Sequence, residues 1–599
     1  MSMLPNRNNV DPELTWDLTT IFKSDDDWQK AYQQAADAGT QAATWQGRLG
    51  NSADDLAAGL AAILNAYRQI EKVYVYASLQ SDQDTANAKY LGFSAQAQSL
   101  WTQISSQTAF MQPEILAIAP DSLTAWLQAP ELKLYQHFIE NLVAEREHVL
   151  SADQEALIAA AGDALNASSA TFNVLNNADL KFGEILDEQG NAVQLSHGTY
   201  GELIKSTKRS VRQAAFESLY ATYNKFQHTF AQTLAGEIKK HTFDAKVHHY
   251  ASARAAAMAE NQIPETVYDT LVDTVNAHLP SLQRYLAFRQ QRLGLDELHM
   301  YDLYTPLNGK PPVSYTIDQA KAVALEALAP LGEDYLSHVR DIFDHHMIDV
   351  VENQNKRSGA YSGGSYDTDP FILLNWQDSI DALFTLVHET GHSVHSWYTR
   401  HNQPYVYGDY SIFVAEIAST TNENLLTDYL LRTQKDPAIQ AYVLNYYLDG
   451  FKGTVYRQTQ FAEFEHWLHQ QDQTAQPLTA EALSQQYAKI NAHYYQGVVQ
   501  DPQIALEWTR IPHFYYNYYV YQYATGFAAA STLAAGISAH KPNAVTHYLN
   551  YLKSGSSQSP LDTMKAAGVD MTKPDYLTSA FAVFDQRLAQ LTALLDQKG

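Results

Sequence analysis

The sequence predicts a mainly α-helical protein built from more than one subdomain, and three observations support this. The chain has 599 residues, more than a single hydrophobic core usually holds. Hydrophobic residues make up 45% of it, which is ample for a packed interior. Along most of its length, apolar residues recur every three or four positions, as in an amphipathic helix. Residues 26–45, 56–80 and 209–243 show this spacing most clearly.

Two short segments depart from the helical pattern and predict small β elements. Residues 180–196 alternate in polarity around Gly190, which predicts a β-hairpin turning at Gln189-Gly190-Asn191. Further along, the chain offers strand candidates at Ile348–Glu352 and Phe371–Asn375, separated by a stretch rich in Gly and Ser.

The hairpin is the best divider that the sequence offers. We predict an N-terminal helical region, a second helical region that ends in the hairpin, and a catalytic region, at residues 1–115, 116–200 and 201–599. No fixed-period repeat and no Pro- or Gly-rich linker marks another boundary.

Composition excludes several classes of protein. Forty basic and 66 acidic residues give a formal charge of −26, which argues against nucleic acid or an anionic membrane as a partner. The chain has no cysteine, so disulfides are excluded and any metal must be held by His, Asp or Glu.

The N-terminus lacks the apolar region of a secretion signal. Residues 514–539 carry no charge, but their tyrosines and other polar groups predict a buried helix pair rather than a membrane span. We therefore expect a cytoplasmic protein.

A metal-binding motif lies within Leu386–Trp397, "LVHETGHSVHSW". His388-Glu389-Thr390-Gly391-His392 matches H-E-x-x-H. On a helix, four residues turn by about 400°, so both imidazoles leave one face, at the spacing that two zinc ligands need. Glu389 points about 100° away, which suits a general base acting on a metal-activated water. Asp378 or Ser379 can cap this helix.

The third ligand sorts the subclass of zinc site. A metzincin would continue as H-x-x-G-x-x-H, but positions 395 and 398 are His and Tyr. A gluzincin takes a glutamate from a second helix instead. Glu416 follows His392 by 24 residues, enough for a loop and a return helix, and Glu423 lies on the same helix face. We predict Glu416 as the third ligand and Glu423 as the acceptor that orients a histidine. His395 lies too far along the helix to join both histidines, so we expect a structural or supporting role.

These residues resemble the thimet-oligopeptidase-like zinc metallopeptidases, and within them the oligoendopeptidase F group. The resemblance covers nearly the whole chain. It is carried by "TWDLTTIF", "SGAYSGGSYDTDPFILLNW", "HETGHSVHSW", "FVAEIASTTNE" and "RIPHFYYNYYVYQYATG". It implies a cytosolic endopeptidase that cleaves oligopeptides within a deep channel enclosed by helical lobes, with one Zn²⁺ per chain.

The aromatic segment Arg510–Gly526 surrounds His513 with tyrosines. Hydrolysis of a peptide creates an oxyanion that needs hydrogen-bond donors, and the resemblance implies a histidine and a tyrosine pair here. We predict His513 together with Tyr518 and Tyr521, on the expectation that these two tyrosines share a helix face. The alternatives left open are Tyr515, Tyr516 and Tyr519.

The glycine-rich run at residues 358–366 can let a substrate backbone approach closely. An exposed strand here would pair with an extended peptide with little regard for its sequence, and similar segments of the family border the substrate cleft. A plain flexible loop is the alternative. We predict substrate-binding roles for Gly359, Tyr361, Gly363, Gly364, Ser365 and Arg510.

The predicted function is zinc-dependent hydrolysis of internal bonds in short unstructured oligopeptides by a monomer or small homo-oligomer. Two rivals remain. A metallocarboxypeptidase of similar helical build would need a cationic clamp for the terminal carboxylate, for which only Arg510, Arg457 or Arg357 can be nominated. A non-catalytic peptide-binding zinc protein is the second, although it would have no use for the general base Glu389.

Overall fold

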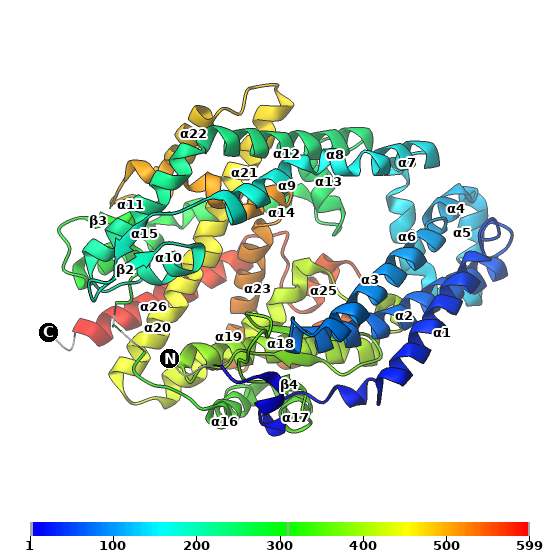
Figure 1. Cartoon of the computed structure of the whole chain (residues 1–599), viewed down its shortest axis with the longest axis horizontal. Coiled ribbons are helices and arrows are strands. Elements are labelled where there is room, and N and C mark those ends of the chain that lie inside the picture. Colours follow the sequence, from blue (N-terminus) through cyan, green and yellow to red (C-terminus); the bar gives the residue numbers. More distant parts are fainter. Residues whose placement is uncertain (1–3, 308, 310, 597–599) are drawn as a thin grey trace. The chain divides into compact units, whose positions relative to one another are not determined.

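The structure is a computed structural model that describes residues 4–307, 309 and 311–596 (Figure 1). These residues fall into two compact units. Unit 1 combines the described residues of 1–149, 313–429 and 536–568, and unit 2 combines those of 150–312, 430–535 and 569–599. Both units are mainly helical, as predicted. Because the units follow contacts rather than chain order, they do not test the three-region division, which stays a prediction.

Unit 1 begins with three long helices that pack side by side: α1 (Asp25–Ala43), α2 (Ala53–Gln83) and α3 (Ala88–Thr108). Serine hydroxyls cap the first two, since Ser24 and Ser52 each accept a backbone N–H three residues on. Trp28 is fully buried between them. Its ring stacks on Phe93 at 4.0 Å, and its indole N–H donates to the carbonyl of Val73 at 2.9 Å.

The remaining helices of unit 1 are shorter, apart from α18 and α19, which carry the metal-binding motif. They are α4 (Met111–Ala117), α5 (Pro120–Trp126), α6 (Gln136–Ala144), α16 (Ile317–Ala327), α17 (Glu333–Asp344), α18 (Ile380–Asn402), α19 (Ile412–Thr433), α24 (Ala544–Ser554) and α25 (Pro560–Ala566). The boundary between the units falls inside α19.

A three-stranded sheet of order β4-β6-β5 lies beside α18 in unit 1. β4 (Ile348–Asp349) and β6 (Phe371–Leu373) pair in parallel, which confirms both predicted strands in shortened form. β5 (Tyr361–Gly363) pairs antiparallel with β6 and has its other edge free of strand pairing. The glycine-rich run therefore contains a strand rather than a plain loop.

A buried ion pair fixes the start of this sheet. The carboxylate of Asp349 on β4 is fully buried and binds the ammonium of Lys356 at 2.6 Å and the guanidinium of Arg7. Burial lowers the pKa of Lys356, and the carboxylate of Asp349 opposes that effect. These bonds join the N-terminal segment to the residues that lead into β5.

Unit 2 begins with short helices and the predicted hairpin. β1 (Glu184–Leu186) and β2 (Ala192–Gln194) pair antiparallel, with Ile185 opposite Val193. Gly190 adopts a φ of 87°, a turn conformation that favours glycine. The preceding helices are α7 (Ala152–Ala160), α8 (Gly162–Leu165) and α9 (Ala167–Val174).

Longer helices build the rest of unit 2, with a small parallel sheet of β3 (Leu298–His299) and β7 (Val498–Val499). They are α10 (His197–Leu203), α11 (Arg209–Lys225), α12 (Gln227–Val247), α13 (Ala253–Ala259), α14 (Glu265–Ala277), α15 (Leu279–Arg292), α20 (Pro437–Phe451), α21 (Arg457–Gln473), α22 (Ala480–Tyr494), α23 (Tyr521–Ser538) and α26 (Asp575–Asp596). The last three residues of α23 belong to unit 1.

Within residues 514–539 the structure has one α-helix, α23, which is preceded by the 3-10 turn η12 (Pro512–Tyr515) and a bend, so the predicted helix pair is wrong. Asn517 and Tyr518 interrupt helical geometry, because both have left-handed backbone φ values, 50° and 57°. Within the described residues, no helix has the length and apolar character needed to cross a membrane.

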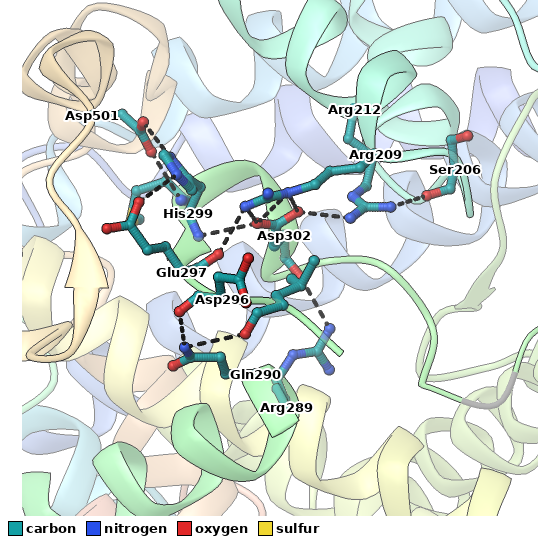
Figure 2. Close-up of polar contacts among 12 residues, drawn as sticks. Ser206, Arg209, Arg212, Arg289, Gln290, Asp296, Glu297, His299, Asp302 and Asp501 are labelled. Carbon is teal, nitrogen blue, oxygen red and sulfur yellow. Dashed lines mark hydrogen bonds and ion pairs between the residues drawn. The ribbon is translucent and has the colours of Figure 1, made fainter. Parts of the chain in front are cut away.

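Asp302 anchors the connection between α15 and the rest of unit 2 (Figure 2). Its side chain is fully buried and accepts from the guanidinium of Arg212 at 2.6 Å and that of Arg209 at 2.9 Å. It also accepts the backbone N–H of His299 at 3.0 Å. His299 in turn bonds to Asp501 at 2.7 Å, which ties β3 to the segment after β7. The carboxylate of Asp302 thus compensates two cations of α11, and His299 extends the cluster to Asp501.

This cluster predicts a large stability effect at Asp302. Asp302→Ala should lower the free energy of unfolding by about 3–5 kcal/mol, because it leaves the buried guanidinium of Arg212 without its anion. Asp296→Ala, which removes an exposed carboxylate from the same loop, is the matched control and should change it by less than about 0.5 kcal/mol. Denaturant unfolding of both variants measures this. Equal stability losses would contradict the assigned role of Asp302.

Candidate active site

The predicted metal-binding motif lies in the middle of α18, as the sequence indicates. Ser379 caps the helix by accepting the N–H of Ala382 at 3.0 Å, so Ser379 rather than Asp378 is the cap. Apolar side chains of α18, among them Leu383, Leu386 and Val387, are fully buried. This packing fixes the helix and leaves His388 and His392 on its partly exposed side.

Three possible ligand atoms converge at this place. The Nε2 atoms of His388 and His392 lie 3.2 Å apart, and each lies 3.4 Å from Oε2 of Glu416 on α19. Bonds of about 2.0–2.2 Å around a tetrahedral zinc would separate its ligand atoms by about 3.3–3.6 Å. Among the described residues, these three form the one group of His, Asp or Glu side chains able to hold a metal. The donor set and its spacing therefore fit zinc.

Gly391 explains how a glutamate on α19 reaches the two histidines. A Cβ atom at this position would lie 2.6 Å from Cα of Ser419 and 3.0 Å from the carbonyl oxygen of Ala418. Glycine is thus required for the backbones of α18 and α19 to approach. The amide of Asn422 adds a hydrogen bond across the same contact, to the carbonyl of Val387 at 3.3 Å.

Glu423 orients His388 from the next turns of α19. Its Oε1 lies 2.5 Å from Nδ1 of His388, so the imidazole donates there and turns the lone pair of Nε2 toward His392 and Glu416. Burial pushes the pKa of His388 down, but Glu416 and Glu423 outweigh it and raise that pKa to about 10. Burial raises the pKa of Glu416, whereas the two histidines outweigh it and lower that pKa. The carboxylates of this cluster therefore favour a positive charge between the two histidines and Glu416.

Glu389 is buried on α18 next to the ligand group without joining it. Its side chain is only 7% exposed, and it is not part of the group of three ligand atoms. Burial raises the pKa of Glu389, an effect that His388 and His392 oppose. The backbone of Ser362 on β5 also opposes this rise, so β5 lies beside the same carboxylate. A buried carboxylate with a raised pKa beside a cation site is suited to accept a proton.

The glycine-rich strand lies directly against this helix. The hydroxyl of Ser362 lies 2.8 Å from that of Ser393 on α18. Tyr361 is held from the other side, since its hydroxyl donates to Asp82 at 2.6 Å. β5 is thus fixed beside Glu389, and among the described residues no strand pairs with its other edge.

His395 does not join the ligand group, in agreement with the prediction. Its ring is buried and stacks on Tyr410 at 3.7 Å, and burial lowers its pKa well below the ordinary histidine value. It packs as a neutral core residue.

The arginines considered as carboxylate clamps all have acidic partners. Arg510 and Arg457 both bind Glu507 in the interior of unit 2, at 2.8 Å and 2.7 Å, and Arg357 binds Asp82 in unit 1 at 3.1 Å. Arg510 also donates to the hydroxyl of Tyr220. These contacts give Arg510 a structural place within unit 2, and its predicted substrate-binding role stays a prediction.

His513 is surrounded by tyrosines in unit 2, although not by the predicted pair. Tyr518 and Tyr521 are each 2% exposed and pack on Tyr268 in the core. Their supposed shared helix face is wrong, because Tyr518 lies in the left-handed bend before α23 begins. Tyr515 is also buried, with its hydroxyl on Thr233 at 2.8 Å.

The rings beside His513 are those of Tyr516, Tyr519 and Tyr523, with centroids 5.5, 6.4 and 5.9 Å away. The hydroxyl of Tyr523 lies 3.4 Å from Nε2 of His513. Tyr516 and Tyr519 belong to the alternatives from the sequence, but Tyr523 was missed. Its spacing of four residues from Tyr519 was the available signal, since it puts both rings on one side of the helix start.

Glu465 on α21 holds the bend that presents these rings. Its Oε1 accepts the backbone N–H of Tyr518 at 2.6 Å, where φ is 57°. The side chain is fully buried, and Oε2 has no hydrogen-bond partner among the described residues. Burial raises the pKa of Glu465 to about 8, while the bond from Tyr518 opposes this.

Family models match most of the chain. The model described as peptidase family M3 matches residues 202–583. The chain belongs to peptidase family M3. A second model, described as oligopeptidase F, matches residues 114–182. This membership confirms the predicted class of enzyme, a metallo-endopeptidase.

Relatives of known name match over nearly the full length. The chain is 50% identical over 595 residues to the group B oligopeptidase PepB of Streptococcus agalactiae, covering 99% of both chains. It is 49% identical over 596 residues to the oligopeptidase PepF of Bacillus subtilis, covering 99% of this chain and 89% of the relative. A crystal structure of oligoendopeptidase-F from Enterococcus faecium superposes with a TM-score of 0.75 at 48% identity, covering 96% of this chain and 99% of that one. The helical peptidase fold predicted from the sequence is thereby confirmed.

The buried carboxyl of Glu465 predicts a pH-dependent stability. The folded-state pKa of Glu465, about 8, exceeds the usual carboxyl value, so the carboxyl takes up a proton on folding. The free energy of unfolding should therefore fall as pH rises from about 4.5 to 8. Glu465→Gln should flatten this decline, by up to about 1.4 kcal/mol per pH unit. The exposed Glu481→Gln variant is the control. Denaturation at pH 5, 6, 7 and 8 measures the slopes, and an unchanged slope in Glu465→Gln would contradict the assignment.

Proposed function

We propose that this metallopeptidase is a zinc-dependent endopeptidase that hydrolyses internal bonds of short, unstructured oligopeptides. The observation that carries the proposal is the convergence of His388, His392 and Glu416 at the separations of tetrahedral zinc ligands. Their side chains are 18–43% exposed, which suits a catalytic site with an open position rather than a closed structural site. When bound, zinc would act as a Lewis acid toward water and the scissile carbonyl.

Glu389 is the proposed general base. Its carboxylate accepts a proton from the attacking water and then delivers it to the leaving amine, so it ends the cycle as it began. Burial assists the first step, because the raised pKa makes the carboxylate a stronger base. Glu423 supports the reaction by holding His388 in one tautomer and orientation.

The free edge of β5 is the proposed binding place for the substrate backbone. An extended peptide there would pair through main-chain N–H and C=O groups, which explains recognition with little sequence preference. Gly359 and Gly364 have φ values of 86° and 158°, so the chain around the strand takes a path that other residues rarely adopt. Tyr361, Gly363 and Ser365 complete this proposed substrate-binding run.

His513 and its tyrosine neighbours are the proposed donors to the oxyanion. Burial lowers the pKa of His513, so the imidazole is neutral at pH 7 and donates a hydrogen bond without carrying charge. Tyr519 and Tyr523 are partly exposed and flank that ring, which favours them over the buried Tyr518 and Tyr521.

We also propose that helical lobes enclose the substrate channel, and that the protein is cytoplasmic and acts as a monomer or small homo-oligomer. The rival metallocarboxypeptidase is disfavoured because its nominated clamps, Arg357, Arg457 and Arg510, are engaged by Asp82 and Glu507. Cleavage of a peptide blocked at both ends separates the two activities.

Glu389→Gln should reduce turnover by several orders of magnitude while zinc content stays near one per chain, since only the base is lost. The exposed Glu131→Gln variant is the matched control and should keep both. Zinc analysis and cleavage of a fluorogenic peptide provide the two readouts. A Glu389→Gln enzyme that loses its zinc, or that keeps most of its rate, would disprove the proposed role.

Substitution of each ligand separates ligand from support. His388→Ala, His392→Ala and Glu416→Ala should lose the metal, whereas Glu423→Ala should weaken zinc affinity by only about 10–100-fold. Competition with a chelator of known affinity measures all four. If Glu423→Ala strips the metal and Glu416→Ala keeps it, the two glutamates have been exchanged.

Substrate size tests the enclosed channel. The enzyme should cleave unstructured peptides of roughly 6–20 residues, which extend at about 3.3 Å per residue, and leave native globular proteins intact. Mass spectrometry of products from a mixed-length library and from unfolded casein measures this. Rapid fragmentation of the long unfolded chain would contradict the enclosed channel while leaving the catalytic proposal standing.

A further inference from the structure

A cavity of about 370 Å³ lies in unit 1 just beyond the end of β5. The backbone that continues this strand, Gly364 to Tyr366, forms one wall, and Arg400 near the end of α18 forms another. Apolar side chains supply much of the remainder: Leu64, Val75, Trp101, Phe138 and Val406. The cavity thus combines a buried guanidinium with an aromatic and aliphatic lining.

Arg400 lacks an anionic partner. Its Nη2 donates to the carbonyl of Gly364 at 3.2 Å, but Nη1 is buried and has no hydrogen-bond partner among the described residues. No ion pair within 4.0 Å involves this guanidinium in the part of the chain that the structure describes. Burial lowers the pKa of Arg400. A buried cation without an anion is costly, which makes this side chain a candidate for binding a ligand.

A second unused donor lines the same cavity. Ser365 is 5% exposed, and its backbone N–H donates to the hydroxyl of Thr368 at 2.8 Å. Its own hydroxyl is buried with no partner among the described residues. Since buried polar groups are nearly always paired, two unpaired donors that line one cavity point to a ligand that supplies an acceptor.

The two carboxylates that line the cavity do not fill this role. Glu71 accepts the hydroxyl of Tyr405 at 2.6 Å, and burial raises the pKa of Glu71. Asp409 is exposed and accepts the backbone N–H of Tyr410 at 2.8 Å. Both act on Arg400 only over a distance beyond ion pairing.

Glycines give the cavity wall its shape. A Cβ atom at Gly364 would lie 2.9 Å from Nη1 of Arg400, and one at Gly408 would lie 2.4 Å from the ring of Tyr366. The glycine at 364 therefore lets the strand extension approach the guanidinium closely.

The cavity is a short distance along the proposed peptide path from the catalytic base. Ser365 follows Ser362, which lies beside Glu389, by three residues, or about 10 Å of extended chain. On α18, Arg400 follows His392 by eight residues, or about 12 Å. Both routes correspond to three or four residues of an extended substrate.

We propose that this cavity is a substrate subsite in which Arg400 and Ser365 bind a carboxylate three or four residues from the cleaved bond. The carboxylate comes either from an Asp or Glu side chain or from the C-terminus of the peptide, and both offer the planar pair of oxygens that a guanidinium binds. This subsite rests on the proposed endopeptidase function and gives it a preference for acidic peptides.

Matched peptide pairs test the subsite. Fluorogenic peptides carrying Glu or Gln at successive positions from the cleaved bond test the side chain, and peptides with a free or amidated C-terminus test the terminal group. At one position, the wild-type kcat/KM should be about tenfold higher for the peptide with the carboxylate than for its uncharged partner, because KM is lower. Arg400→Gln should reduce that ratio to near one. Arg340→Gln, which alters an exposed arginine on α17, should preserve it.

The ratio within each variant cancels any general loss of activity. A wild-type ratio near one at all positions and at both termini, or a preference that persists in Arg400→Gln, would overturn the subsite. If Arg400→Gln fails to fold, Ser365→Ala removes the second donor and should still lower the ratio. Peptides too short to reach the cavity separate the subsite proposal from the endopeptidase proposal. If the wild type cleaves neither the short nor the longer peptides, the endopeptidase function itself fails.

Discussion

The close contact between α18 and α19 is the constraint on which the candidate active site depends. Gly391 lets the backbone of Ser419 approach α18, and a side chain there would separate the helices. Only at this separation does Glu416 come within 3.4 Å of both histidines. The same contact brings Glu423 to His388. A glycine within the metal-binding motif is therefore as necessary for the site as the ligands that flank it.

Much of this site could be predicted from the sequence because its geometry is local. Four residues of helix fix the spacing of His388 and His392, and the return helix is long enough to supply Glu416. The small strands were also predictable from their composition, and Gly190 marked the hairpin turn. These features follow from backbone periodicity, which short stretches of sequence encode directly.

The tyrosine segment shows where such reasoning fails. A helical period was assumed across residues 514–539, but Asn517 and Tyr518 take left-handed conformations that break it. Glu465 stabilises this conformation by accepting the N–H of Tyr518. It lies on α21, more than fifty positions earlier, so the local sequence does not reveal it. The partners of Arg510 and Arg457 were likewise hidden, because Glu507 becomes their shared anion only in the folded interior.

The central claim is that two histidines and one glutamate hold a zinc with an open position. X-ray absorption spectroscopy at the zinc edge of the purified metal-loaded protein tests it most directly. The account predicts about four nitrogen and oxygen neighbours at about 2.0–2.2 Å, with outer-shell signals of two imidazoles. A first shell with three or more imidazoles, or with six oxygen neighbours, would contradict it.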